Sequence, residues 1–161
     1  MMVLFYASSI VAILATLMTI TRINITHALL YFIVSLLALA VIFYTLGAHF
    51  AAALEVIVYA GAIMVLFLFV VMMLNLGQAT EEQERIWLQP SIWIFPALLA
   101  AALLVPLVMT LNASAPEPMA HTVVVAKDVG IALFGPYVLA VELASMLLLA
   151  GLVGAFHLAR K

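Results

Sequence analysis

The chain has 161 residues, of which 70% are hydrophobic and 7% are charged, and it contains no cysteine. An average soluble domain has about 25% charged residues, so five cationic and seven acidic side chains cannot cover a water-facing surface, and the composition predicts an integral membrane protein. The net charge of −2 argues against nucleic-acid binding, and the missing cysteines exclude disulfides, thiolate zinc sites and cysteine-ligated iron–sulfur clusters in this chain.

Long runs without charged residues predict five membrane-spanning helices. A helix needs roughly 20 predominantly apolar residues to cross a bilayer. The runs that meet this requirement are, in chain order, 3–21, 27–47, 51–76, 91–111 and 133–157. The longest connection between them is 112–132. The sequence therefore predicts an all-α membrane protein, in which residues 1–161 form a single membrane domain.

The distribution of positive charge predicts the orientation of these spans. Lysine and arginine near the span ends collect on the cytoplasmic side of a membrane protein. With the N-terminus outside, Arg22, Arg85, Arg160 and Lys161 fall on the cytoplasmic side and only Lys127 falls on the other. The pattern predicts an external N-terminus and a cytoplasmic C-terminus.

The third predicted span carries an acid, Glu55. A charged side chain near the bilayer centre costs at least about 2.5 kcal/mol on insertion scales, so an intramembrane acid is a functional candidate. In a regular helix Tyr59, four residues later, shares the face of Glu55. Small side chains share this face as well: Ala51, Ala52 and Ala62. Such a face contacts another helix, and we predict that Glu55 and Tyr59 form a proton relay, with a purely structural acid as the alternative.

The same span contains a glycine, Gly61, which costs about 1 kcal/mol relative to alanine inside a helix. Two interpretations are open. Gly61 allows a neighbouring helix to approach closely, which is the interpretation that the sequence alone favours. The alternative is a kink or π-bulge in the segment 58–63 (VYAGAI), where a helix changes its hydrogen-bonding register.

The fifth predicted span carries the second intramembrane acid, Glu142. It follows Pro136 by only a turn or two, so a charge at headgroup depth and a functional acid are weighed equally. The histidines lie at span ends or in connections without i,i+4 pairing: His27, His49, His121 and His157. The sequence therefore predicts no metal or haem site.

Several segments resemble one known family. The runs 53–75 (ALEVIVYAGAIMVLFLFVVMMLN) and 133–151 (LFGPYVLAVELASMLLLAG) are similar to subunit J of bacterial proton-pumping NADH:quinone oxidoreductase, respiratory complex I. The shorter segments 27–31 (HALLY) and 46–50 (LGAHF) resemble it as well. The mitochondrial relative of this subunit is subunit 6.

The resemblance implies a multi-pass, non-redox subunit of the membrane arm, located in the bacterial inner membrane. Such a subunit helps couple electron transfer from NADH to quinone to proton translocation. Glu55 would belong to a chain of polar residues and water, and a π-bulge between Tyr59 and Gly61 would open and close the water path. A purely structural subunit is the alternative function.

The resemblance also implies partners and cofactors. The expected partners are subunit K, the quinone-site subunit, the antiporter-like subunits and membrane lipid. FMN, the iron–sulfur clusters, NADH and quinone are expected to bind in other subunits. No cofactor is expected to bind to this chain.

Overall fold

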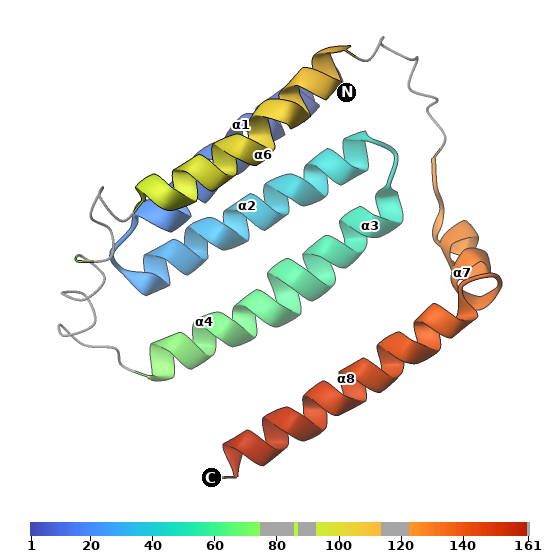
Figure 1. Ribbon diagram of the computed structural model, residues 1–161. Helices are drawn as coiled ribbons and strands as arrows, with labels where there is room; N and C mark the ends of the chain where they lie inside the picture. Colours follow the sequence, from blue (N-terminus) through green and yellow to red (C-terminus); the bar gives the residue numbers. More distant parts are fainter. Residues whose placement is uncertain (75–85, 87–92, 114–122, 161) are drawn as a thin grey trace.

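The computed structural model describes residues 1–74, 86, 93–113 and 123–160, with only the backbone for 110–113. These residues form helices and their connections (Figure 1), which confirms the all-α prediction. The helices are α1 (Met2–Thr21), α2 (Ile25–Thr45), α3 (His49–Leu54), the π-helix η1 (Glu55–Ile63), α4 (Met64–Met73), α6 (Ile94–Ala113), α7 (Ala126–Phe134) and α8 (Val138–Ala159).

The bounds of the first four predicted spans agree with those of the observed helices to within a few residues. Four helices are long and apolar enough to cross a membrane: Met2–Thr21, Ile25–Thr45, His49–Met73 and Val138–Ala159. α6 is apolar over Ile94–Met109. The predicted span ends at 75–76 and 91–92 lie outside the described residues. The two termini lie at opposite ends of the molecule (Figure 1).

Local signals set the tight turns between the first three spans. The Asn24 side chain accepts a hydrogen bond of 3.2 Å from the His27 amide and so caps the N-terminus of α2. Gly47, between α2 and α3, has a φ of 85°, a conformation that glycine adopts without steric cost. These turns place α1, α2 and the third span side by side in alternating directions (Figure 1).

The fifth predicted span begins too early. Residues 133–137 are not part of α8. The helix α7 ends at Phe134, the helical conformation is interrupted at Gly135, and α8 begins at Val138. A Cβ on Gly135 would lie only 2.7 Å from the carbonyl oxygen of Ile131, so this break requires glycine. Pro136 lacks an amide proton and favours the interruption. An additional short helix, α7, thus begins within the predicted 112–132 connection and ends at Phe134.

Small and hydroxyl side chains form the packed part of the molecule. On α1, Ser8, Ala12 and Ala15 are buried against α2. The Ser35 side chain of α2 is 3% exposed, and its hydroxyl oxygen lies 2.8 Å from that of Thr16 on α1. Small residues let two helices approach closely, and such hydrogen bonds between membrane helices are worth about 0.6 kcal/mol on average.

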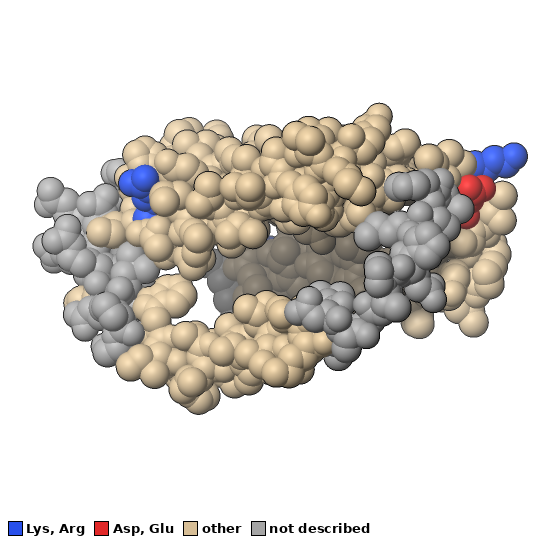
Figure 2. All heavy atoms as spheres, turned by 90° about the horizontal axis from the view of Figure 1, so that it is seen from above, with Lys and Arg blue, Asp and Glu red and all other residues tan. Residues whose placement is uncertain are grey.

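The helices α6 and α8 remain exposed in the isolated chain. All described side chains on α6 are exposed, and on α8 only Val141 is half-buried. Figure 2 shows an open hollow between two rows of side chains, with charged groups only at the two ends of the face in view. The apolar surfaces of α6 and α8 are therefore available to lipid or to other chains.

Candidate functional site

The third span is one continuous helix with a π-helical middle. α3, η1 and α4 follow one another without a break, and the junction residues Glu55 and Ile63 keep helical dihedral angles. At the end of η1, the Met64 amide donates to the carbonyl of Tyr59, five residues earlier. The π geometry, one of the two interpretations of this segment, is thus present, and it extends over nine residues.

Gly61 lies within the π-helix, close to a backbone carbonyl of the preceding turn. A Cβ built on Gly61 would lie 2.9 Å from the carbonyl oxygen of Val56, five residues earlier. Real Cβ atoms essentially never come this close to such an atom, so any larger residue requires the backbone of this turn to shift. Glycine therefore permits the π-helix here.

The π-helix changes which side chains of the third span face α2. Ala52 and Ala60 are buried, with 7% and 5% of their surface exposed, and Glu55 is half-buried. Tyr59 is 53% exposed. In an α-helix the residue above Glu55 is the one four positions later, Tyr59. Here the buried side chain is that of Ala60, five positions after Glu55, as a π-helical register requires.

Glu55 and Tyr59 line one groove, although Tyr59 is not buried. The groove has a volume of about 280 Å³, and its other walls are Phe43 of α2 together with Ala51, Leu54 and Val58 of the third span. The Glu55 carboxyl and the Tyr59 hydroxyl make no hydrogen bond to each other within the described part of the chain. The structure therefore places the two predicted relay residues at one opening, whose walls are mainly apolar.

The predicted small-residue face is only partly as expected. Ala52 is buried, Ala51 lines the groove, and Ala62 is exposed. The buried Ala60 takes the place expected for a residue of this face. Phe43 was not singled out from the sequence, because one phenylalanine in an apolar helix carries no signal of its own.

Glu142 lies apart from this groove. It is the fifth residue of α8, its side chain is exposed, and its backbone carbonyl accepts a hydrogen bond of 2.7 Å from the Ser145 hydroxyl. It does not line the opening shared by Glu55 and Tyr59. Among the residues that the structure describes, His, Asp and Glu form no cluster suited to a metal ion.

Comparison with known proteins identifies the family. Residues 15–158 match the family described as NADH-ubiquinone/plastoquinone oxidoreductase chain 6. The chain belongs to this family. It is 62% identical to NADH-quinone oxidoreductase subunit J of Escherichia coli strain K12 over 157 residues, which cover 98% of this chain and 85% of the relative.

Relatives from other bacteria that match this chain carry the same subunit name. Subunit J of Pseudomonas aeruginosa is 61% identical over 158 residues, covering 98% of this chain and 95% of the relative. Subunit J of Buchnera aphidicola from Schizaphis graminum is 46% identical over 157 residues, covering 98% and 96%. These matches confirm the resemblance to subunit J and the assignment of the chain to a multi-subunit NADH-quinone oxidoreductase.

Proposed function

We propose that this chain is a non-redox membrane-arm subunit that helps couple electron transfer from NADH to quinone to proton translocation. The observation that carries the proposal is the position of Glu55, a half-buried carboxyl at the first residue of a nine-residue π-helix. Ionisable residues within membrane helices commonly mark proton paths. π-Helical segments commonly occur at functional sites.

A change of helical register supplies the conformational step. Conversion of one π turn to an α turn shifts the residues that follow by one position, which is a rotation of about 100°. The position above Glu55 would then pass from Ala60 to Tyr59. A methyl group would be exchanged for a phenol at the α2 interface, and the groove beside Glu55 would change shape.

Proton transfer at the groove needs few groups. The Glu55 carboxylate takes up a proton from water or from a polar group of a neighbouring subunit and later releases it, and the Tyr59 hydroxyl extends the hydrogen-bonded path. A groove of about 280 Å³ has room for several waters, since one water occupies about 30 Å³ of liquid. The register change would make or break this path.

The partners of this function are other subunits. We propose that the exposed faces of α6 and α8, the latter carrying Glu142, contact membrane-arm neighbours: subunit K, the quinone-site subunit and the antiporter-like subunits. FMN, iron–sulfur clusters, NADH and quinone would bind in other subunits. The chain would cross the bacterial inner membrane five times.

We propose an external N-terminus, which chemical labelling can test. Arg22 and Arg160 lie at the end of the molecule where α1 and α8 finish, and the predicted cytoplasmic loop containing Gln83 lies outside the described residues. The chain has no cysteine, so a single cysteine introduced at Gln83 or at Ser114 reports the side of the membrane on which that position lies. In intact spheroplasts, an impermeant maleimide is expected to label Ser114→Cys and to spare Gln83→Cys. The opposite pattern would mean that the topology is inverted.

Removal of the Tyr59 hydroxyl tests the relay. Tyr59→Phe keeps the ring but removes one hydrogen-bonding group, so proton uptake and quinone reduction are expected to fall about twofold to tenfold, the rate equivalent of one hydrogen bond. The matched control is Tyr44→Phe, because Tyr44 is 49% exposed, stacks on His49 and does not line the groove. Both are measured in vesicles that contain equal amounts of assembled complex.

A purely structural subunit predicts a different outcome. In that case Tyr59→Phe and Tyr44→Phe complexes would both keep the parent rates, because the packed surface of the third span is unchanged. Equal losses in the two variants would also argue against a specific path through the groove.

A further inference from the structure

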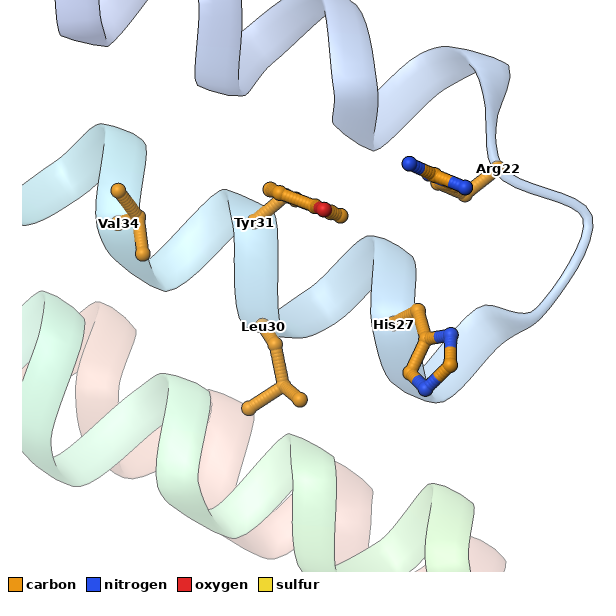
Figure 3. A pocket seen from close by; sticks show the side chains of 5 residues that line it. All are labelled: Arg22, His27, Leu30, Tyr31 and Val34. Atoms are coloured by element: carbon orange, nitrogen blue, oxygen red, sulfur yellow. The ribbon is translucent and has the colours of Figure 1, made fainter.

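A second cleft lies at the turn between α1 and α2, away from the Glu55 groove. Its volume is about 380 Å³, and Arg22, His27, Leu30, Tyr31 and Val34 line it (Figure 3). Arg22 belongs to the turn, and the other four residues belong to α2. None of these residues has a role in the proposed proton path.

The Arg22 guanidinium is held in position and is available to an anion. Its central carbon lies 5.4 Å from the centroid of the Tyr31 ring, and Nη2 lies 3.7 Å from the Met18 sulfur. In the part of the chain that the structure describes, Arg22 pairs with no carboxylate. The exposed His27 imidazole is nearby (Figure 3) and adds donor capacity. Arg22 therefore supplies a cation at the polar end of the cleft.

The cleft runs from headgroup depth into the apolar region. α1 has 20 residues, so it spans about 30 Å, which is the thickness of the hydrocarbon core. Arg22 directly follows α1 and so lies at headgroup level. Along α2, His27, Tyr31 and Val34 follow one face, at a rise of about 10 Å. The walls below the cation are thus the side chains of Leu30 and Val34.

We propose that this cleft binds an anionic phospholipid. The phosphate would accept hydrogen bonds from the Arg22 guanidinium, whose planar fork matches phosphate geometry. One acyl chain would lie against Leu30 and Val34. The Tyr31 ring would hold the guanidinium in place. A zwitterionic lipid offers the same phosphate but carries a compensating cation, so the charge of the cleft favours the anionic lipid.

Photolabelling of the assembled complex tests this proposal. Vesicles contain the complex and a photoactivatable tracer, either phosphatidylglycerol or phosphatidylcholine with the same acyl chains. One arginine near an anionic lipid is expected to give about a fivefold preference. We therefore expect peptides of the 22–34 region to be labelled about fivefold more by the phosphatidylglycerol tracer, and Arg22→Gln to remove this preference.

Two further variants separate the cleft from general surface charge. Arg160→Gln removes a cation at the same end of the molecule but outside the cleft, and it is expected to keep the preference. Tyr31→Leu keeps the charge but removes the ring that positions it, and it is expected to weaken the preference even if Arg22→Gln does not assemble.

Three results would overturn the proposal. They are equal labelling of the parent by both tracers, equal loss of preference in Arg22→Gln and Arg160→Gln, or a photoreactive residue at Val34 that crosslinks to another subunit instead of lipid. The last result would show that a protein occupies the cleft.

Discussion

Replacement of Gly61 by leucine is expected to lower NADH-driven quinone reduction and proton uptake about tenfold in a complex that still assembles. A Cβ at this position would lie 2.9 Å from the Val56 carbonyl oxygen, so the π turn cannot keep its present geometry. Backbone strain of this kind costs about 1–3 kcal/mol. A bias of about 1.4 kcal/mol between the π and α registers is enough for a tenfold change in rate.

The matched control is Gly154→Leu on α8. A Cβ on Gly154 meets no atom within 4 Å, so the same increase in side-chain size causes no clash within this chain. Parent rates per assembled complex are expected for this variant, because a clash of α8 with a neighbouring subunit would lower the amount of assembled complex and not the geometry of the π-helix. Gly61→Ala adds the same clashing carbon and is expected to act in the same direction as Gly61→Leu.

Assembly and turnover are measured separately for these variants. Assembly is read from the amount of intact complex in the membrane, and turnover is normalised to that amount. Parent rates in an assembled Gly61→Leu complex would mean that Gly61 serves close packing alone.

The span pattern was predictable from the sequence because hydrophobic length is a local property. A run of about 20 apolar residues is long enough to cross a bilayer whatever its neighbours are, and the first four predicted spans agree with the described helices. The fifth predicted span differs from the structure because the length criterion joined the end of α7 to α8. Gly135 and Pro136 already marked the break, but the residues on both sides of them are apolar.

The helical register of the third span was not predictable to the same degree. The choice between π and α depends on which carbonyl each amide selects, and the apolar residues of this span are compatible with both arrangements. Gly61 was compatible with close packing or with a bulge, and only the 2.9 Å approach to Val56 distinguishes its role. The sequence paired Glu55 with Tyr59 on one face, and both line the groove, but it did not predict that the buried side chain of this turn is that of Ala60.

The Glu55→Gln variant is expected to lower quinone reduction and proton uptake together, without abolishing either. Glutamine keeps the shape of the half-buried side chain but cannot take up or release a proton at neutral pH. We expect a loss of about threefold to tenfold, well short of the ~100-fold or larger loss that follows removal of an indispensable acid–base group. The reason is that acids of a neighbouring subunit share the path in this proposal.

The control for Glu55→Gln is Glu142→Gln. Glu142 is also an acid in a membrane-spanning helix, but it is exposed on α8 and lies outside the Glu55 groove. Rates near the parent values are expected for it, because the groove and the π-helix are unchanged. Equal effects of the two substitutions would point to the loss of negative charge in general.

The central claim is that the Glu55 carboxyl takes part in energy coupling. The most direct measurement is NADH-dependent quinone reduction and proton uptake, recorded together in vesicles with equal amounts of assembled parent, Glu55→Gln and Glu142→Gln complexes. The account predicts that both rates fall in Glu55→Gln and stay near the parent values in Glu142→Gln. Parent values of both rates in an assembled Glu55→Gln complex would contradict it and would leave a structural role for this chain.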